Sequence, residues 1–511
     1  MKIKFTYMLA AAIGLSSCSD EFLDLAPPTT LSSATYFKTE EHFNQALNSA
    51  YERTRQIATS GIFMDEMRSD NTFFTYYPGD RGPYLSTEVL SQFLDDQNTG
   101  SYVSARYDAC YSGISRVNTI VSRIDDIELS PESRNRILGE AYFLRAFYYF
   151  DLVKNFGGVP LHLSEVSAEG EAFLPRNSVE EVYAQIIEDL SVAIPLLPVA
   201  STFPQSGRAT KGAGKMLLAC VYMTKPTREY AKAEVELTDI TKMNYSLLPT
   251  YAAVFNPNNK NNSESIFEVQ YQEGDAGQQS FFNWRFIPKT SNSEVLMGVR
   301  GNNYAGDFSG GWNVPTQEMV NSYETGDTRL EASVAVVEGR MESDLFTTES
   351  VKSIVGYKPA AGKTHYYMVK KYLHGPYSRE FNTDENWPVY RYSGALLLLA
   401  ECLVEQGKAT QALPHLNAVR RRAGLPALTQ ATKLNVSNEM RHELAFENHR
   451  YQDLIRTGQA IDVLTKKGQQ MKALYGFLLP SAFNVTQNRL IFAIPFRELQ
   501  VNNQLVQNPG Y

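Results

Sequence analysis

The sequence predicts an all-α protein, built as a superhelix of paired helices that carries a loop-rich insertion with minor short strands. Three observations support this fold class. Long segments place apolar residues at helical spacing, and two of them form similar helical hairpins. Between these hairpins, about residues 245–389 are rich in Asn, Gly and Ser and short of helical patterns. We therefore expect one domain over residues 35–511, with a helical scaffold at about 35–244 and 390–511.

Composition assigns the 511-residue chain to the ordinary globular class. Apolar residues make up 43% and charged residues 20%, which argues against wholesale disorder. The 48 Lys and Arg stand against 56 Asp and Glu, and the net charge of −8 argues against a nucleic-acid partner, because such binding needs a basic surface. Four cysteines are too few for a disulfide scaffold. Aromatic residues reach 12%, and they can build a core, line a sugar site, or both.

The N-terminus has the pattern of a secretory signal. A short basic start precedes an apolar run, Phe5–Leu15, which is too short to span a bilayer, because a spanning helix needs about 20 residues. Leu15-Ser16-Ser17-Cys18 resembles the lipobox of bacterial lipoproteins, which implies cleavage of residues 1–17 and acyl chains on Cys18. Residues 18–34 then form a lipidated tether. A plain cleaved signal with an incidental cysteine is the alternative.

Helical periodicity begins after the tether. Thr39, followed by two glutamates, fits an N-cap, and two or three helices are expected from there to about residue 126. An aromatic loop, Phe73–Pro83, interrupts them. Ser130-Pro131 opens a helix that runs to Phe156 and ends at two glycines. Another helix is expected over Val179–Leu197, which prolines close.

Two segments, residues 212–242 and 392–423, show the pattern helix, tight turn, helix. In the first, Leu217-Leu218-Ala219 is followed twelve residues later by Ala231 and then by Val235. In the second, Leu398-Leu399-Ala400 is followed at the same spacing by Ala412 and then by Leu416. This weak repeat resembles tetratricopeptide helix pairs, in which small residues let helices approach closely. Helical hairpins of any kind also favour small residues at contacts.

The insertion between the hairpins holds all three tryptophans, Trp284, Trp312 and Trp387. Ser265–Tyr271 has partial strand alternation. Trp387 precedes Pro388 and the next helix, so we expect a structural role for it. The other loops of this region are where binding usually resides.

Signals for catalysis or metal binding are poor. The chain has no His-Glu-x-x-His and no Gly-x-Ser-x-Gly, and Lys211–Lys215 departs from a phosphate loop, so it is expected to start a helix. His442 and His449 lie near one face of an expected charged helix, Glu439–Arg456, which favours pairing with neighbouring charges over a metal site. Asp70 and Asp80 could help hold an ion, but they stand in no ligand motif. We therefore expect no catalytic residue, no metal and no cofactor.

Three cysteines remain once Cys18 is assigned to the lipid anchor. An odd number forbids full pairing, and Cys220 and Cys402 lie within apolar helical runs. We interpret them as small buried residues rather than as ligands or nucleophiles. Cys110 is the third.

Several stretches together, in the right order, resemble the SusD/RagB family of outer-membrane nutrient-binding lipoproteins. One segment, Gly326-Asp327-Thr328-Arg329, is similar to the family's Asp-Pro-Arg segment with Thr in place of Pro. Arginines in these stretches are expected to join carboxylates between packed helices, as at Arg145, Arg441 and Arg450. The other stretches are Arg145–Leu161, Tyr390–Glu401, Leu416–Pro426, Arg441–Arg456, Ile494–Leu499 and Gln507–Tyr511.

This resemblance implies a function in nutrient capture, without catalysis. It implies that the lipoprotein is anchored through Cys18 in the outer membrane, at the cell surface, and docks as a lid on a SusC-like TonB-dependent transporter. Asp20 and Glu21 resemble a surface-export signal, although they could equally be solvated linker residues. The nutrient is expected to be a glycan, whose rings stack on aromatic side chains and whose hydroxyl groups bind polar ones.

Sites in this family use exposed aromatic residues on loops, so the candidates here are aromatic loop residues and their polar neighbours. For each tryptophan, the alternative is packing in the core. Three other functions remain open: peptide binding within the same family, a surface hydrolase, and a structural adaptor. The ligand-binding candidates are Tyr76, Tyr77, Trp284, Tyr304 and Trp312, with Arg81, Asn283 and Asn313 as polar partners.

Overall fold

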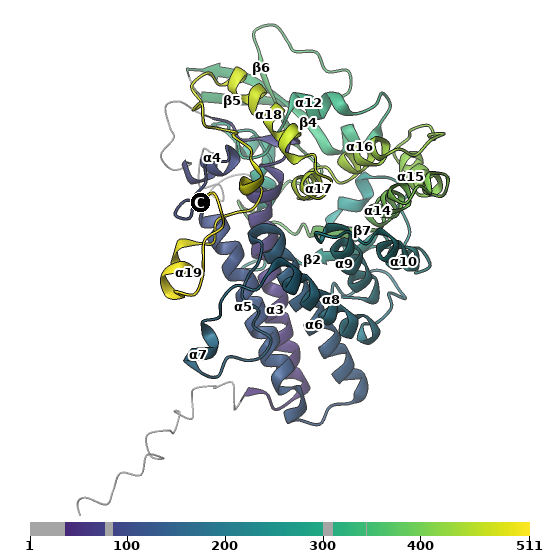
Figure 1. The fold of residues 1–511 in the computed structure, drawn as a ribbon. Coiled ribbons are helices and arrows are strands. Elements are labelled where there is room, and N and C mark those ends of the chain that lie inside the picture. The colour runs from purple at the N-terminus through teal and green to yellow at the C-terminus, as the bar shows by residue number, and fades with distance from the viewer. Residues whose placement is uncertain (1–35, 77–84, 300–309, 344) are drawn as a thin grey trace, which may run out of the picture.

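The computed structural model describes residues 36–76, 85–299, 310–343 and 345–511. The expected signal peptide, the tether and Cys18 lie outside this range, as do Tyr77, Asp80, Arg81 and Tyr304. About 51% of the chain is helical, which confirms the predicted fold class. Figure 1 shows long helices in the lower half of the molecule, helical hairpins at one side, and the longest strands at the top.

Long antiparallel helices form the N-terminal part of the scaffold. Helix α3 (Glu40–Gly61) packs on α5 (Ser101–Arg123), α5 on α6 (Pro131–Phe156), and α6 on α8 (Val179–Leu196). The predicted caps are confirmed: Thr39 and Ser130 accept backbone N–H groups of the first turns, and Gly157 ends α6 at a φ of +74°. The shorter elements here are η2 (Ile62–Glu66), α4 (Leu85–Ser91), η3 (Ile124–Asp126) and α7 (Glu169–Ala172).

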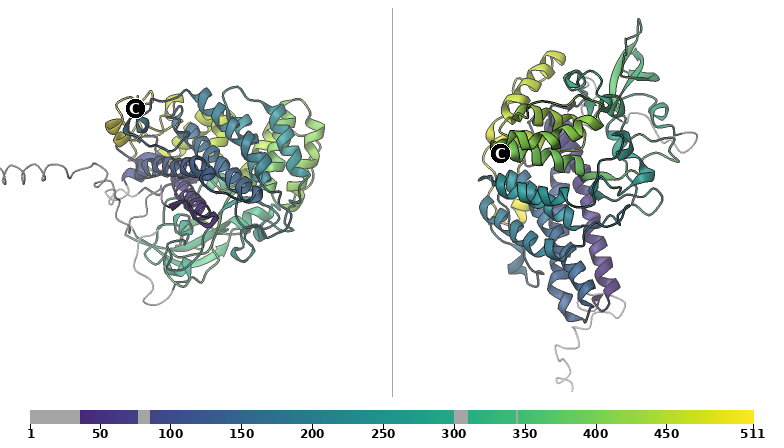
Figure 2. Two further views of the ribbon diagram at one scale, coloured as in Figure 1. Left: turned by 90° about the horizontal axis from the view of Figure 1, so that it is seen from below. Right: turned by 90° about the vertical axis from the view of Figure 1, so that its right-hand side faces the viewer.

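The two predicted helical hairpins are present and lie against each other. The first comprises α9 (Lys211–Thr224) and α10 (Tyr230–Thr241), and the second α14 (Tyr392–Glu405) and α15 (Ala409–Arg422). Helix α10 packs against α14, although the insertion separates them in sequence. Figure 2 shows the stacked helices on one side of the molecule and the insertion on the other.

The predicted register of the first hairpin is wrong by two residues. Ala231 and Val235 are exposed, and the buried contacts come from Ala233 and Leu237. Ala412 and Leu416 of the second hairpin are buried, as expected. The turn between α9 and α10 is longer than the turn between α14 and α15, which shifts the contact positions.

The prediction of one continuous helix over Glu439–Arg456 is also wrong. Helix α16 (Lys433–Glu443) ends early, and α17 (Arg450–Arg456) follows a tight turn. Phe446 and Asn448 in this turn have φ values of +66° and +65°, outside the helical region. The turn buries the Phe446 ring and brings the Glu447 carboxylate to Lys371. The chain then continues through α18 (Ala460–Leu474), η8 (Gln487–Arg489) and α19 (Phe496–Val501).

The insertion is more regular than the sequence suggests. The predicted strand is confirmed in part as β2 (Ser265–Val269), which pairs with β7 (Trp387–Arg391) in an antiparallel ladder. An unanticipated antiparallel sheet, in the order β5-β4-β6, follows β3. The first six residues of β4 are all buried, so its sequence has no alternation that would mark a strand. The remaining strands are β1 (Thr72–Phe73), paired with β3 (Val314–Pro315), then β4 (Val334–Glu342), β5 (Leu345–Ser353) and β6 (Thr364–Val369).

Two separate hydrophobic cores stabilise these parts. The larger core runs through the helices and extends into the insertion, where Phe286, Trp312 and Tyr372 belong to it, and a second, smaller core surrounds Trp284. Its other buried members include Ile287, Met297, Val337 and Phe346. Short helices connect the strands: η4 (Ala252–Phe255), η5 (Pro257–Asn259), η6 (Phe282–Arg285), α11 (Glu294–Met297), α12 (Gln317–Ser322) and α13 (Thr328–Ser333).

The predictions for Cys402, Trp387 and Lys211–Lys215 are confirmed, and that for Cys220 is confirmed in part. Cys110 and Cys402 are buried, Cys220 is half-buried, and all three are free thiols. Trp387 is buried and stacks on Tyr372. Lys211–Lys215 is the start of α9, capped by Thr210. Among the described helices, none combines the length and the apolar character needed to cross a bilayer.

Candidate ligand-binding groove

A groove of about 720 Å³ opens where the insertion meets the C-terminal helices. Strands β1, β3 and β6, helix α12 and the end of α18 line it, and we call it the α12–β6 groove. Pockets for small ligands usually span about 300–1,000 Å³, so this volume suits an oligomer of small rings. Its lining includes Phe73, Val314, Glu318, Tyr366, Tyr367 and Leu474.

Two consecutive tyrosines of the edge strand β6 line the groove, from opposite faces of the sheet. Tyr366 and Tyr367 of β6 are half-buried, so part of each side chain is open to a ligand. The Tyr366 ring packs edge-on against Phe346, with centroids 4.8 Å apart, and the Tyr367 hydroxyl donates to Gln317 Oε1 at 2.8 Å. These contacts fix the side chains while leaving surface for stacking.

Helix α12 supplies the polar wall. Thr316 caps it by accepting the N–H of Met319 at 3.0 Å, and the buried Met319 and Val320 hold its inner face. Gln317, Glu318 and Asn321 therefore lie on the exposed face, toward the groove. Amide and carboxylate groups beside aromatic rings can bind the hydroxyl groups of a ligand whose apolar faces stack on those rings.

The Glu318 carboxylate is held by Arg441 of α16. Arg441 Nη1 and Nη2 donate to Glu318 Oε1 and Oε2 at 3.1 and 2.6 Å, which is a bidentate pair. Arg441 also lies 3.0 Å from Asp70, which Arg450 binds through two further bonds. Despite burial, the two arginines lower the pKa of Asp70 to about 2. The predicted roles of Arg441 and Arg450 are confirmed, and so is that of Arg145, which pairs with Asp189 at 2.6 Å.

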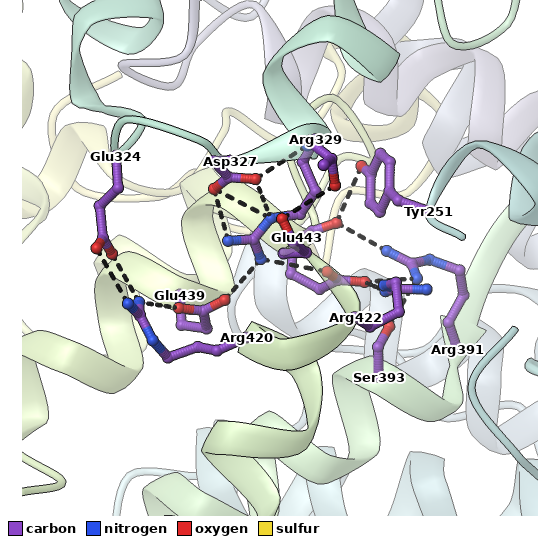
Figure 3. A network of polar contacts seen from close by, with 12 residues as sticks. Tyr251, Glu324, Asp327, Arg329, Arg391, Ser393, Arg420, Arg422, Glu439 and Glu443 are labelled. Carbon is purple, nitrogen blue, oxygen red and sulfur yellow. Dashed lines mark hydrogen bonds and ion pairs between the residues drawn. The ribbon is translucent and has the colours of Figure 1, made fainter. Parts of the chain in front are cut away.

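Helix α16 also carries a buried ion network behind the groove. Figure 3 shows Glu439 and Glu443 facing guanidinium groups that come from α13, β7 and α15. Glu443 Oε1 lies 3.0 Å from Arg391 Nη1, and Glu443 also pairs with Arg422. Arg329 Nη1 lies 2.7 Å from Glu439 and 3.3 Å from Glu443. The network therefore joins the scaffold to the insertion.

Burial and pairing oppose each other at the two glutamates of this network. Burial alone would raise the pKa of Glu443, but Arg422, Arg391 and Arg329 together hold it well below the usual range. At Glu439, burial outweighs the two paired arginines and raises the pKa. Glu443 is therefore the anionic centre of the network.

His442, which was considered as a metal ligand, contacts a tyrosine ring and a serine hydroxyl group. The His442 ring stacks on Tyr323 at 4.5 Å, and its Nε2 lies 3.0 Å from Ser322 Oγ. Burial, together with the arginines nearby, lowers its pKa to about 3. Asp70 likewise faces two arginines rather than an ion. Within the described ranges, no group of three or more His, Cys, Asp or Glu side chains could hold a metal ion.

Most described ligand candidates are buried in this structure. Trp284 is fully buried and packs on Tyr377 and Phe381, and Asn283 beside it is also buried. Trp312 lies 4.5 Å from the Arg285 guanidinium and is 7% exposed. None of the three offers much surface to a ligand here, and their contact with one stays a prediction.

The other two described candidates lie beside the groove without lining it. Tyr76 is buried, and its hydroxyl lies 2.6 Å from Ser91 Oγ. Asn313 donates to the Ile62 carbonyl at 3.0 Å and accepts from Thr72 at 2.7 Å. Each is close in sequence to a lining residue of β1 or β3. The sequence interpretation missed Tyr366, Tyr367 and Glu318, although the tyrosine doublet of β6 resembles the Tyr76-Tyr77 doublet that it did select.

Comparison with protein families identifies the chain. A model described as "SusD family" matches residues 263–511, and one described as "Starch-binding associating with outer membrane" matches residues 21–223. Together they cover most of the chain. The chain belongs to the SusD family. The family expected from the sequence is therefore confirmed.

Known SusD-like proteins resemble the chain over nearly its whole length. SusD-like protein P38 from Formosa agariphila is 27% identical, over 100% of this chain and 99% of that protein. A solved structure named as a laminarin binding SusD-like protein has 26% identity and a TM-score of 0.73, covering 93% of this chain and 100% of that one. Surface glycan-binding protein A from Bacteroides thetaiotaomicron, in complex with laminarihexaose, shares the fold at a TM-score of 0.72 and 22% identity, over 92% of this chain and 100% of that one.

Proposed function

We propose that this SusD-family protein is a cell-surface lipoprotein that binds glycans, without turning them over, in the α12–β6 groove. We further propose that it delivers them to a SusC-like TonB-dependent transporter in the outer membrane. The observation that carries the binding proposal is the juxtaposition of half-exposed tyrosines on β6 with the amide and carboxylate side chains on α12. Binding in solved SusD-like relatives supports the ligand class, since one is named for laminarin and another was solved with laminarihexaose.

The arrangement suits a sugar chain for a physical reason. A pyranose ring has an apolar face that can stack on a tyrosine, and its edge carries hydroxyl groups that donate and accept hydrogen bonds. The groove offers tyrosine rings and hydrogen-bonding groups side by side, and a polymer can occupy several such subsites. Modest affinity at each subsite would permit release to the transporter.

Removing the groove tyrosines is expected to weaken glycan binding. Tyr366→Ala and Tyr367→Ala should each reduce affinity roughly tenfold, because each loses a stacking surface, and the double variant should lose most binding. The measurement is calorimetric titration of residues 19–511 with laminarin and a polysaccharide panel, with assays for product release. Tyr222→Ala, at a half-buried tyrosine of α9 outside the groove, is the control.

Other outcomes would contradict parts of this proposal. Unchanged glycan affinity in the double variant would place the site elsewhere in the chain. Binding of peptide digests instead of glycans would replace the ligand class, and release of shortened sugars would establish a hydrolase. Binding to no nutrient at all would favour an adaptor.

The lipid anchor is tested separately through Cys18. Cys18→Ser should shift the protein from the membrane fraction to the soluble fraction, because several acyl chains hold a protein on a bilayer and their loss removes that attachment. Fractionation of cells with detection by antibody measures this, and Cys110→Ser provides a control cysteine. Membrane retention of the Cys18 variant would contradict lipidation at that residue.

A further inference from the structure

Among the described residues that line the α12–β6 groove, Glu318 is the only acidic one. Its side chain is 44% exposed, whereas the Arg441 side chain that binds it is only 8% exposed. The guanidinium group therefore lies behind the carboxylate, and the negative group faces the groove. A carboxylate accepts about four hydrogen bonds, and Arg441 occupies one position on each oxygen.

Glu318 is the exposed carboxylate in a group of paired charges. Arg441 lies between Glu318 and Asp70, and Asp70 also pairs with Arg450, so two carboxylates face two guanidinium groups. Asp70 and Arg441 are both largely buried. Gln317 and Asn321 on the same exposed face of α12 are uncharged, and Gln317 donates to Asn321 at 2.8 Å. A ligand in the groove therefore meets a fixed negative group on this side.

Such a carboxylate distinguishes ligands by their charge. Sugar hydroxyl groups donate to a carboxylate in charge-assisted hydrogen bonds, which are stronger than those between neutral groups. A uronate or sulfate ester at the same place brings a second negative charge near Glu318, which is repulsive. The bidentate pair prevents the carboxylate from turning away, because its rotamer is fixed by Arg441.

We propose that Glu318, positioned by Arg441, selects uncharged glycans over anionic glycans in the α12–β6 groove. This inference rests on the proposed function and adds its specificity-determining residue. Arg441 acts through Glu318 as a positioning residue.

The protein itself provides a matched control pair. Glu324 is 49% exposed and accepts two bonds from the buried Arg420, at 2.6 and 3.0 Å, yet it does not line the groove. Glu318→Gln and Glu324→Gln thus remove the same charge from similar surroundings. Both substitutions should lower the thermal midpoint of unfolding by similar amounts. A difference in glycan affinity between the two variants would therefore come from the position of Glu318 in the groove.

The experiment compares uncharged polysaccharides with derivatives of the same chains that carry carboxylate groups, and Glu318→Gln separates the effect of charge from that of the added size. Calorimetric titration uses uncharged polysaccharides, beginning with laminarin, each beside its carboxymethylated derivative. The wild-type protein should prefer the uncharged form by tenfold or more, and added salt should reduce the preference. Glu318→Gln should weaken uncharged binding about tenfold, since a charge-assisted hydrogen bond becomes a neutral one, and should improve anionic binding, since Arg441 loses its nearest anion.

Two further variants complete the test. Glu324→Gln should keep the wild-type preference. Glu318→Asp keeps the charge but shortens the side chain, so it should weaken binding while retaining rejection of the charged ligand. Equal wild-type affinity for both forms, or an unchanged preference in Glu318→Gln, would overturn this inference and leave the proposed function standing. Failure of the wild-type protein to bind any polysaccharide of the panel would overturn both.

Discussion

Replacing Glu443 with alanine is expected to lower the free energy of unfolding by about 3–5 kcal/mol, a typical cost of removing one partner from a buried ion pair. Glu443 is fully buried and is shared by Arg391, Arg422 and Arg329. Its removal leaves three guanidinium groups with less negative charge around them. The remaining carboxylates, Glu264, Glu439 and Glu447, are already paired with these arginines or their neighbours.

Chemical denaturation of the variant and the wild-type protein measures this effect. Glu324→Ala is the control, because Glu324 pairs with Arg420 at the edge of the same network and is half-exposed, so its loss should cost about 1 kcal/mol or less. Similar losses in the two variants would show that the network does not depend on Glu443 as its anionic centre. Restored stability in a combined Glu443→Leu, Arg391→Met variant would fit an uncompensated charge as the cause.

Replacing Trp284 with alanine is the second change with a large expected effect, again about 3–5 kcal/mol of unfolding free energy. The indole is fully buried and packs with Tyr377 and Phe381, with ring centroids 5.5 and 5.2 Å away. Its removal leaves a large cavity in the second core. Because that core is separate from the helical core, the loss should appear mainly in the insertion.

Amide hydrogen exchange measures which part of the chain loses stability in the Trp284→Ala variant. Backbone amides of β4 and β6 should exchange faster in Trp284→Ala, while those of α14 should stay near wild-type rates. Tyr366→Ala, at a half-buried position, serves as the comparison, with a smaller loss of stability and a direct loss of glycan affinity. If Trp284→Ala instead abolished binding at unchanged stability, Trp284 would be a ligand contact, as the sequence first suggested.

The helical scaffold could be predicted because its signals are local. Caps such as Thr39 and Ser130, the glycine that ends α6, and the hairpins α9–α10 and α14–α15 all follow from short-range patterns. The predictions were wrong where the length of a turn or tertiary packing determines the local structure. Turn length set the register of the first hairpin, and the burial of Phe446 and Glu447 broke the expected helix after Glu443.

The groove was harder to predict because distant segments build it. Phe73 begins the predicted aromatic loop, and Val314 follows Trp312 and Asn313, so two of its walls adjoin predicted candidates. The exposure of Tyr366 and Tyr367 depends on pairing between β4 and β6, which has no clear local signal. Tryptophan identity alone also cannot indicate exposure: Trp284 packs in the second core, and its burial depends on residues from several separate segments.

Separate cores have a consequence for how this protein can diversify. Mutations within the second core change packing inside the insertion around Trp284, whereas the groove residues Phe73, Tyr367 and Met471 pack with the larger core. The insertion begins and ends near one pair of neighbouring strands, β2 and β7, and it also contacts the scaffold through the pairing of β1 with β3 and through the buried ion network. Related proteins could therefore vary the second core without changing the helices, whereas an exchange of the whole insertion between relatives would also have to match β1 and the ion network.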